Sequence, residues 1–265
     1  MNVVLVGYGR MGREVEAVLD RRGHRIAGCI DPSPQLDLNC PYPVFRPGDP
    51  LPDETHGIIE FALKPGIEER VAAYGALGIP AVIGTTGLDA RVPELKKTFS
   101  DAAARAGKSQ TAAIVRGNNF SVGAHLFFRL TAAAAKLMNR TEEYDVSLIE
   151  YHHNKKADHP SGTAITAAEG ILDRLDRKTH ILSSLPDGPV PPEALHVSAV
   201  RVGAVPGIHE MHMDSTADYL TIRHEARSRG GFALGSVQAL EWLQGRSGWF
   251  EADDFIDHLL TGERS

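Results

Sequence analysis

The chain has 265 residues, of which 42% are hydrophobic and 23% charged, and its formal net charge is -6. These proportions are typical of a folded globular protein with one large domain or two modest ones. The acidic balance, spread without long runs of one sign, argues against nucleic acid or an anionic membrane surface as a partner. No segment approaches the length of a membrane span, so we expect no membrane insertion.

The cysteines and the start of the chain predict a cytoplasmic location. Cys29 lies in an apolar run, where a buried free thiol is the ordinary interpretation, and the only other cysteine is Cys40. The first predicted strand begins almost at Met1, so we expect no signal peptide ahead of the fold. A chain that does not rely on disulfides fits a reducing compartment.

The first half of the chain predicts a parallel sheet. Short β-branched runs alternate with helical patterns, as in βαβ units. The expected strands are 2–6, 25–30, 57–61, 80–84 and 111–115, and the expected helices are 10–22, 66–77 and 92–106. Gly23, Gly78 and Gly107 follow these helices as stop signals. Five prolines between residues 40 and 55, Pro47 among them, predict an irregular connection. The fold class is therefore α/β, with a Rossmann-like doubly wound parallel sheet.

A second, α+β domain is predicted after residue 121. A helix over 122–138 leads to a strand ending near Tyr151, and another helix begins near Thr163. Three closely spaced strands follow at 196–202, 208–213 and 219–225, which we interpret as antiparallel in an open mixed or antiparallel sheet. Helical patterns at 232–243 and 252–260 are expected to return to the first domain. The expected domains are thus 1–121 joined by 231–265, and 122–230.

A glycine-rich loop predicts a dinucleotide site in the first domain. Three glycines stand at G-x-G-x-x-G spacing directly after a strand, in the run Gly7, Tyr8, Gly9, Arg10, Met11, Gly12. The first permits the tight turn, the second lets the pyrophosphate approach, and the third lets helix and strand pack closely. The start of the helix then supplies free amide donors for the anion.

The second strand and two later turns extend this prediction. Asp31 follows the second strand, where a carboxylate can accept hydrogen bonds from the adenosine ribose, although it also suits an ordinary turn. Such a carboxylate would repel a 2′-phosphate, and residues 32–34 supply no arginine, so we favour NADH over NADPH, with Arg10 and Arg13 left as rival phosphate ligands. The turns expected to contact the nicotinamide end comprise Gly84, Thr85, Thr86, Gly117, Asn118, Asn119 and Phe120.

The densest chemical cluster extends from residue 150 to residue 163. His152, His153 and Lys156 lie near a strand end, and histidine and lysine are suited to proton transfer. Ser161, Gly162 and Thr163 then enter a helix, where they cap it or grip a substrate carboxylate. Five histidines could in principle hold a metal: His152, His153, His159, His209 and His212. Adjacent strand residues point to opposite faces and no metal motif accompanies them, so we predict no metal site.

These motifs resemble a known family. The pattern E-x-H-H-x-x-K-x-D-x-P-S-G-T-A over residues 150–164 resembles the signature of the 4-hydroxy-tetrahydrodipicolinate (dihydrodipicolinate) reductases. Further matching segments are residues 84–87, 119–123, 201–203, 206–210, 224–226, 228–229 and 232–235. The resemblance therefore covers nearly the whole chain.

The resemblance implies an enzyme that reduces a small cyclic dicarboxylate with NADH or NADPH on the diaminopimelate route to lysine. By position, His152 and Lys156 correspond to the family's catalytic proton-transfer residues, and His153, Ser161, Gly162 and Thr163 to its substrate contacts. The family pairs a Rossmann domain with a substrate-binding domain whose open sheet builds a homotetramer. The chain departs from the pattern in a glycine loop shorter by one residue, in residues 60–62 and in residues 117–118, which affects the expected cofactor preference.

Two other functions compete with this interpretation. Another small Rossmann oxidoreductase, such as an amino-acid dehydrogenase, would share the nucleotide half, but the His-His-x-x-Lys run and the Ser-Gly-Thr turn argue against it. A redox-sensing regulator would need a basic recognition helix, which the sequence does not show.

Overall fold

The computed structural model describes residues 1–31, 40–46 and 48–262. The chain divides into two compact units, of which unit 1 comprises Met1–Ser121 with Arg229–Ser265 and unit 2 comprises Val122–Ser228. Residues 32–34, which entered the cofactor prediction, Pro47 and residues 263–265 lie outside the described residues.

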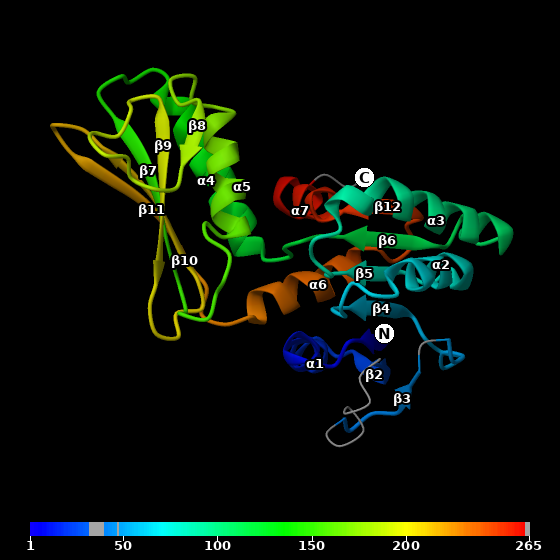
Figure 1. Ribbon diagram of the computed structural model, residues 1–265. Coiled ribbons are helices and arrows are strands. Elements are labelled where there is room, and N and C mark those ends of the chain that lie inside the picture. The colour runs from blue at the N-terminus through cyan, green and yellow to red at the C-terminus, as the bar shows by residue number, and fades with distance from the viewer. Residues whose placement is uncertain (32–39, 47, 263–265) are drawn as a thin grey trace. The chain divides into compact units, whose positions relative to one another are not determined.

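A seven-stranded sheet forms the centre of unit 1 (Figure 1). Its strands are β1 (Asn2–Val6), β2 (Arg25–Ile30), β3 (Val44–Phe45), β4 (Gly57–Glu60), β5 (Ala81–Ile83), β6 (Ala113–Arg116) and β12 (Gly248–Glu251). They lie in the order β12-β6-β5-β4-β1-β2-β3, and every neighbouring pair is parallel. Because β2 and β4 flank β1 on opposite sides, the strand order reverses at β1, as in a Rossmann sheet. The predicted α/β fold class is confirmed.

Helices cover both faces of this sheet. They are α1 (Arg10–Arg21), α2 (Ile67–Leu77), α3 (Val92–Arg105), α6 (Gly230–Trp242) and α7 (Ala252–Thr261), with a short 3-10 turn, η2 (Asp89–Arg91). Val4 and Val6 of β1 pack into one core with Val71 of α2 and Leu95 of α3. On the other face α1 contacts α6, and Leu240 of α6 occupies the space that a Cβ at Gly57 would need. The inner strands β1, β4, β5 and β6 are buried on both faces and are mainly apolar for that reason.

Most predicted helices of unit 1 are confirmed to within one residue, and Gly23, Gly78 and Gly107 all adopt the positive φ expected of helix stops. The predicted irregular connection between residues 40 and 55 holds one short strand, β3. The prediction missed β3 and β12, because strands of two to four residues are too short to show a periodic pattern.

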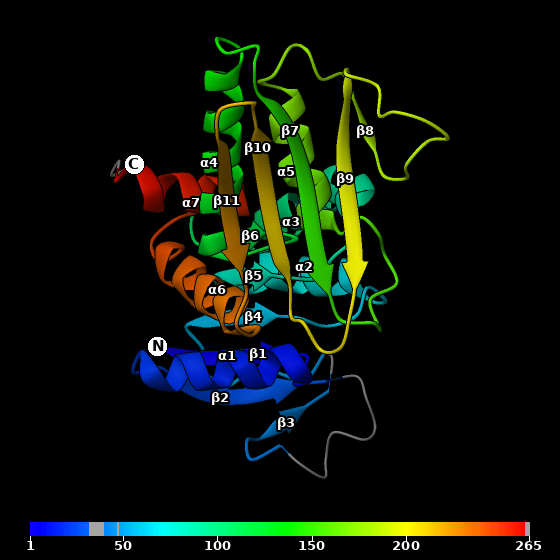
Figure 2. The same cartoon turned by 90° about the vertical axis from the view of Figure 1, so that its left-hand side faces the viewer.

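Unit 2 is a five-stranded mixed sheet with two helices. Its elements are α4 (Val122–Met138), β7 (Asp145–His152), α5 (Gly162–Leu172), β8 (His180–Leu182), β9 (Ala194–Arg201), β10 (Ile208–Asp214) and β11 (Tyr219–Glu225). Figure 2 shows α4 and α5 behind the sheet, packed on one of its faces. The core on that face joins Leu148, Val197 and Met211 from three strands with Phe127 of α4 and Ile171 of α5.

β9, β10 and β11 alternate in direction, as predicted, but β9 does not pair with β10. The strand order is β11-β10-β7-β9-β8, so β7 lies between β9 and β10. β10 is antiparallel to both of its neighbours, β7 and β11, whereas β9 runs parallel to both β7 and β8. The short connection between β9 and β10 resembles a hairpin in the sequence, but it passes the end of β7. Among the described residues, no helix combines the length and apolar composition needed to cross a membrane.

Candidate active site

The three predicted cofactor motifs lie at one edge of the sheet in unit 1. The glycine loop follows β1, residues 84–86 follow β5 and residues 117–120 follow β6. These three strands belong to one parallel sheet, so their carboxyl ends meet at the same edge. In doubly wound sheets that edge is where ligands bind, next to the point where strand order reverses.

The glycine loop has the shape needed to receive a pyrophosphate. Gly7 has φ +88°, and a Cβ there would lie 2.9 Å from the Phe61 and Ala62 backbone. A Cβ at Gly12 would lie 2.5 Å from the Gly7 carbonyl oxygen, so only glycine lets helix and loop pack this closely. Gly9 is different: it caps the start of α1, and a Cβ there would meet no atom within 4 Å. The loop therefore leaves open space in front of the helix amides.

The side chain of Tyr8 turns away from this opening. It is buried, and its hydroxyl donates a 2.5 Å hydrogen bond to Glu16, which also accepts from Tyr42. The Tyr8 backbone amide donates to Asp31 Oδ2 at 3.0 Å, so Asp31 is held beside the loop. Burial and the contact with Glu16 raise the pKa of the Tyr8 hydroxyl far above its usual range. Tyr8 thus contributes its backbone to the loop surface.

The other two residues of the predicted loop are accessible. Arg10 is exposed, and Met11 is half-buried. Arg13, one turn further along α1, places its guanidinium 4.9 Å from the centre of the Tyr8 ring. Two arginines therefore stand near the start of α1, where an anion would lie.

The turn after β5 is fixed by a buried carboxylate. Thr85 is buried, and its hydroxyl lies 3.1 Å from Glu60 Oε1 and 2.9 Å from the Ala62 carbonyl oxygen. Glu60, fully buried at the end of β4, also accepts hydrogen bonds from Arg70 and Tyr74. The Thr85 hydroxyl is therefore occupied by contacts within the fold, whereas Thr86 is exposed.

In the turn after β6, several side chains are also engaged in contacts within the fold. The Asn118 side chain is exposed but bonds both Arg116 and Asp89, at 2.7 and 2.9 Å. Contact with Arg116 lowers the pKa of Asp89. The Asn119 side chain accepts a hydrogen bond from the Ser121 amide, and Phe120 is buried in the core. A ligand at this turn would therefore contact mainly backbone groups.

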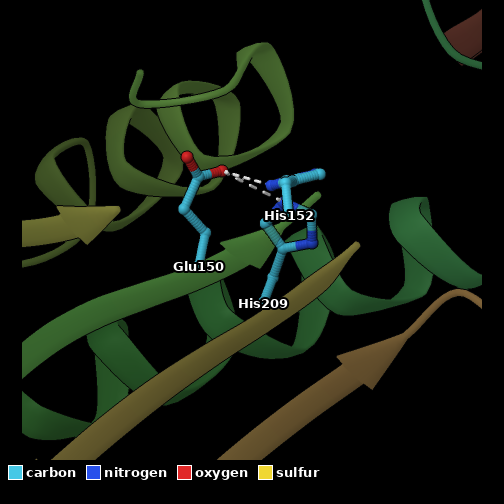
Figure 3. Close-up of side chains that lie close together, drawn as sticks. All are labelled: Glu150, His152 and His209. Atoms are coloured by element: carbon cyan, nitrogen blue, oxygen red, sulfur yellow. Dashed lines mark ion pairs between the residues drawn. The ribbon is translucent and has the colours of Figure 1, made fainter. Parts of the chain in front are cut away.

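The densest group of ionisable side chains lies in unit 2. Glu150, His152 and His209 are buried, and Figure 3 shows the carboxylate of Glu150 pointing toward the two imidazole rings. Glu150 Oε2 lies 3.3 Å from His152 Nδ1 and 3.7 Å from His209 Nε2. Strand register creates this group, because His209 of β10 pairs directly with Glu150 of β7, and His152 lies two residues further along β7 on the same face.

Glu150 is ionised although it is fully buried. Its Oε1 accepts hydrogen bonds from Arg201 at 2.8 Å and from the Ser161 amide at 3.0 Å. Burial opposes ionisation, but the contacts with His152, Ser161 and Arg201 together outweigh it and lower the pKa of the carboxyl to about 2. Among the described residues, Oε2 has no hydrogen-bond partner.

His209 is held neutral by its surroundings. Burial, with the neighbouring His152 as a further cause, lowers the pKa of the His209 imidazole to about 3. Its Nε2 lies 3.2 Å from the Ser161 hydroxyl. His152 packs edge to face on His209, and its Nε2 lies 3.0 Å from where a Cβ at Gly207 would stand. The absence of a side chain at Gly207 leaves room for the His152 ring.

Lys156 and His153 lie in the turn after β7. The Lys156 ammonium bonds both carboxylate oxygens of Asp158 at 2.8 Å, and its amide bonds the His153 carbonyl oxygen. Arg201 donates to the carbonyl oxygens of Lys156 and Asp158, so one side chain ties this turn to Glu150. Contact with Lys156, against the opposing effect of burial, lowers the pKa of Asp158.

The start of α5 faces the same cluster. Ser161 caps the helix by accepting the Ala164 amide at 3.2 Å, which confirms the capping interpretation of this residue. Because Ser161 is also buried, its hydroxyl serves the fold. Gly162 is exposed and Thr163 is half-buried, so the first turn of α5 presents their backbone amides.

The predicted residues of unit 2 therefore gather at the end of β7 and the start of α5, but three partners were missed. In the sequence, Glu150 and Arg201 stand out only as part of the family pattern, and His209 only as one of several histidines. An alternating strand pattern in β7 could have placed Glu150 and His152 on one face. The register that brings His209 and Arg201 beside them depends on the strand order, which the sequence pattern did not predict.

Solved structures share this fold. The dipicolinate-bound dihydrodipicolinate reductase of Paenisporosarcina sp. TG-14 superposes with a TM-score of 0.71 at 20% identity, covering 95% of this chain and 97% of that one. The DAP dehydrogenase of C. glutamicum, solved in complex with DAP, gives a TM-score of 0.51 at 16% identity and covers 100% of this chain and 99% of that one. These matches establish the shared architecture.

Sequence comparisons are more specific. The family model described as "Dihydrodipicolinate reductase, N-terminus" matches residues 1–120, and that described as "Dihydrodipicolinate reductase, C-terminus" matches residues 123–256. The 4-hydroxy-tetrahydrodipicolinate reductase of Christiangramia forsetii is 34% identical, covering 98% of this chain and 99% of that protein. The 4-hydroxy-tetrahydrodipicolinate reductase of Chromobacterium violaceum is 37% identical, covering 96% of this chain and 98% of that protein. The chain belongs to the dihydrodipicolinate reductase family.

Proposed function

We propose that this enzyme reduces 4-hydroxy-tetrahydrodipicolinate to tetrahydrodipicolinate with NAD(P)H, on the diaminopimelate route to lysine. The observation that carries the proposal is the match of both family halves in order, over residues 1–120 and 123–256. Full-length relatives named for this reaction support it. Unit 1 would then hold the dinucleotide and unit 2 the substrate.

The residues at the sheet edge of unit 1 fit a dinucleotide. The open space at Gly9, the amides at the start of α1 and the carboxylate of Asp31 supply a pyrophosphate site and a ribose acceptor. When bound, the reduced nicotinamide supplies the hydride. The loop is shaped by Gly7, Tyr8, Met11 and Gly12. Backbone and small polar groups at the same edge come from Gly84, Thr86, Gly117 and Asn119.

We propose that His152 and Lys156 carry out the proton transfer of the reaction. Reduction places electron density on the conjugated imine of the substrate, and a proton must meet that charge. The Lys156 ammonium is a cation on a flexible stem, and its partner Asp158 is mostly exposed, so the ammonium can exchange this contact for a substrate. The Nδ1 atom of His152 lies 3.3 Å from Oε2 of the ionised Glu150, so the carboxylate orients the imidazole ring. Lys156 is the donor we favour, with His152 as its neighbouring acid or base.

The start of α5 is proposed to bind a substrate carboxylate. Gly162 and Thr163 present the amides of the first helical turn, and the helix dipole favours an anion there. His153, half-buried in the adjoining turn, adds a side-chain donor. Ser161 contributes indirectly, because it caps the helix and donates its amide to Glu150.

We propose a preference for NADH over NADPH. Asp31 is held beside the glycine loop by the Tyr8 amide, where its charge would repel a 2′-phosphate. Arg10 and Arg13 stand at the start of α1, and Arg13 lies against the Tyr8 ring. Replacing Asp31 with asparagine should therefore raise kcat/KM for NADPH relative to NADH, as initial rates with each cofactor would measure.

A homotetramer built through the open face of the unit 2 sheet is also proposed. Within unit 2, α4 and α5 cover one face, and the opposite face carries the exposed side chains of Val200 and Tyr219. Sedimentation velocity gives the assembly size directly, and a monomer at micromolar concentration would contradict this part of the proposal. A cytoplasmic location is proposed as well, and the free thiols of Cys29 and Cys40 are consistent with it.

The deciding experiment measures loss of reduced-nicotinamide absorbance with 4-hydroxy-tetrahydrodipicolinate, generated freshly from pyruvate and aspartate semialdehyde. Substrate-dependent oxidation of NADH or NADPH is the expected result, and the two rates rank the cofactors. Cofactor binding without turnover would contradict the proposal and favour another dehydrogenase or a redox sensor.

A further inference from the structure

Glu150, His152 and His209 form an arrangement that proton transfer alone does not require. One atom of each, a carboxylate oxygen and two imidazole nitrogens, lies within 4.8 Å of the others, and all three residues are buried (Figure 3). Among the described residues, Glu150 Oε2 and His152 Nδ1 have no hydrogen-bond partner, although they lie 3.3 Å apart. Buried polar atoms normally make hydrogen bonds, and these two atoms face each other as an ion pair without an aligned hydrogen bond, so both can still bind a shared ligand.

We propose that Glu150, His152 and His209 bind a divalent transition-metal ion such as Zn²⁺, and that the bound ion reversibly inhibits the enzyme by taking up His152. The inhibitory effect rests on the proposed role of His152 in proton transfer. The metal site itself does not depend on that role.

The spacing of the donors fits zinc. Two ligands of a tetrahedral zinc ion at about 2.0–2.2 Å lie roughly 3.4 Å from each other. Glu150 Oε2 is 3.3 Å from His152 Nδ1 and 3.7 Å from His209 Nε2, so both pairs are already near this spacing. Small rotations of the two rings would bring the third pair into range.

The donor types also fit. Two imidazoles and one carboxylate are an established ligand set for zinc, and they leave a fourth position for water. Ser161 and Arg201 hold Glu150 Oε1, which fixes the carboxylate with Oε2 toward the rings. The Ser161 hydroxyl, now 3.2 Å from His209 Nε2, must turn away, but it keeps its capping bond to the Ala164 amide.

Charge near the site sets the expected affinity. Arg201 lies 2.8 Å from the far oxygen of Glu150, and its charge opposes the entry of a cation. Binding is therefore weaker than at a closed structural zinc site, and the ion leaves when a chelator is added. An ion held this way acts as a reversible inhibitor.

The test uses the purified full-length protein without substrate, because a cyclic dicarboxylate with a ring nitrogen can itself chelate metal ions. Isothermal titration with Zn²⁺ gives stoichiometry and affinity, and Co²⁺ reports coordination through its visible absorption. We expect one ion per chain and Co²⁺ bands that Zn²⁺ displaces. His209→Ala should weaken binding by at least about 100-fold, since even losing a partner of a ligand costs roughly 10–100-fold.

His180→Ala is the matched control, because His180 is an exposed histidine of β8 in the same unit. It should bind Zn²⁺ like the parent protein. Glu150→Gln provides a second variant if His209→Ala does not fold, and it should also weaken binding. Absence of stoichiometric binding, or equal binding by His209→Ala or Glu150→Gln and the parent, would overturn the metal site and leave a buried group of two imidazoles around one carboxylate.

Turnover assays complete the test. Zn²⁺ should inhibit the parent enzyme at the concentration that saturates the site, and EDTA should restore its activity. Binding without inhibition would overturn the inhibitory role. A parent protein that binds Zn²⁺ but never turns over the proposed substrate would contradict the proposed function while leaving the metal site intact.

Discussion

The two candidate sites of this enzyme are built in opposite ways. At the sheet edge of unit 1, missing side chains create the site: Gly9 opens a space, and Gly7 and Gly12 let backbone segments approach. At the end of β7 in unit 2, buried charges create it, with Glu150 ionised between Arg201 and two histidines. A dinucleotide is held mainly by backbone amides and shape, whereas protonating a reduced imine needs side chains with controlled charge.

The sharpest test of this contrast is Lys156→Ala. Because Lys156 would act on the reacting substrate and lies in unit 2, kcat should fall by about 10²–10⁴-fold, the usual contribution of a proton-transfer group. NADH affinity, measured by fluorescence titration, should stay within about twofold of the parent value. Lys155→Ala, which removes the exposed neighbouring lysine, is the control and should turn over normally. Normal turnover of Lys156→Ala would remove this residue from the mechanism.

Glu150→Gln tests the dependence of unit 2 on its buried charge. The substitution leaves Arg201 without its carboxylate, and breaking a buried ion pair costs about 3–5 kcal/mol. Because the Arg201 side chain is 19% exposed and keeps three carbonyl partners, we expect the low end, about 3 kcal/mol. Denaturant unfolding measures the loss, with the exposed Glu142→Gln as control. Equal stability of the two variants would show that the network contributes little to folding.

A pair of glycine variants tests the role of shape in unit 1. Gly12→Ala places a Cβ 2.5 Å from the Gly7 carbonyl oxygen, and overpacking of this kind costs about 1–3 kcal/mol. Its melting temperature should therefore fall. Gly9→Ala meets no atom within 4 Å, so the fold should keep its stability while NADH affinity drops, because the new methyl group occupies the pyrophosphate space. The opposite pattern would show that Gly9 serves the fold.

The same contrast explains what the sequence could predict. The glycine loop is a local feature, since its spacing, the preceding strand and the following helix all lie within residues 2–21. The buried cluster of unit 2 is non-local, because Glu150, Arg201 and His209 meet only through the register of β7 with β9 and β10. No local pattern encodes that β7 lies between β9 and β10, so the sequence could not show that β9 pairs with β7.

The sequence also does not show which side chains of the turns in unit 1 face outward. Tyr8, Thr85 and Phe120 were predicted to contact the cofactor, and the structure buries all three side chains. Glu60 explains Thr85: Oε1 of its buried carboxylate contacts both the Thr85 hydroxyl and Arg70, and Oε2 accepts a hydrogen bond from Tyr74. A sequence identifies the turns that follow the strands, but only packing decides which side chain in each turn faces outward.

The smallest expected effect concerns an ion pair outside both sites. Glu241 of α6 bonds Arg22 at 2.6 Å and His24 at 2.8 Å, which joins α6 to the end of α1. Burial opposes its ionisation, but contacts with Arg22 and His24 outweigh it and lower the pKa of Glu241.

A carboxyl whose pKa is lower in the folded state stabilises the fold above its unfolded pKa, about 4.3, and loses that contribution as pH falls through the folded pKa. Because Arg22 is 36% exposed, solvent screening keeps the contribution below about 1 kcal/mol. The stability difference between the parent and Glu241→Gln should therefore be present near pH 6 and shrink below about pH 4 in denaturant unfolding. A difference that stays constant down to acid pH would mean that packing, and not charge, gives Glu241 its effect.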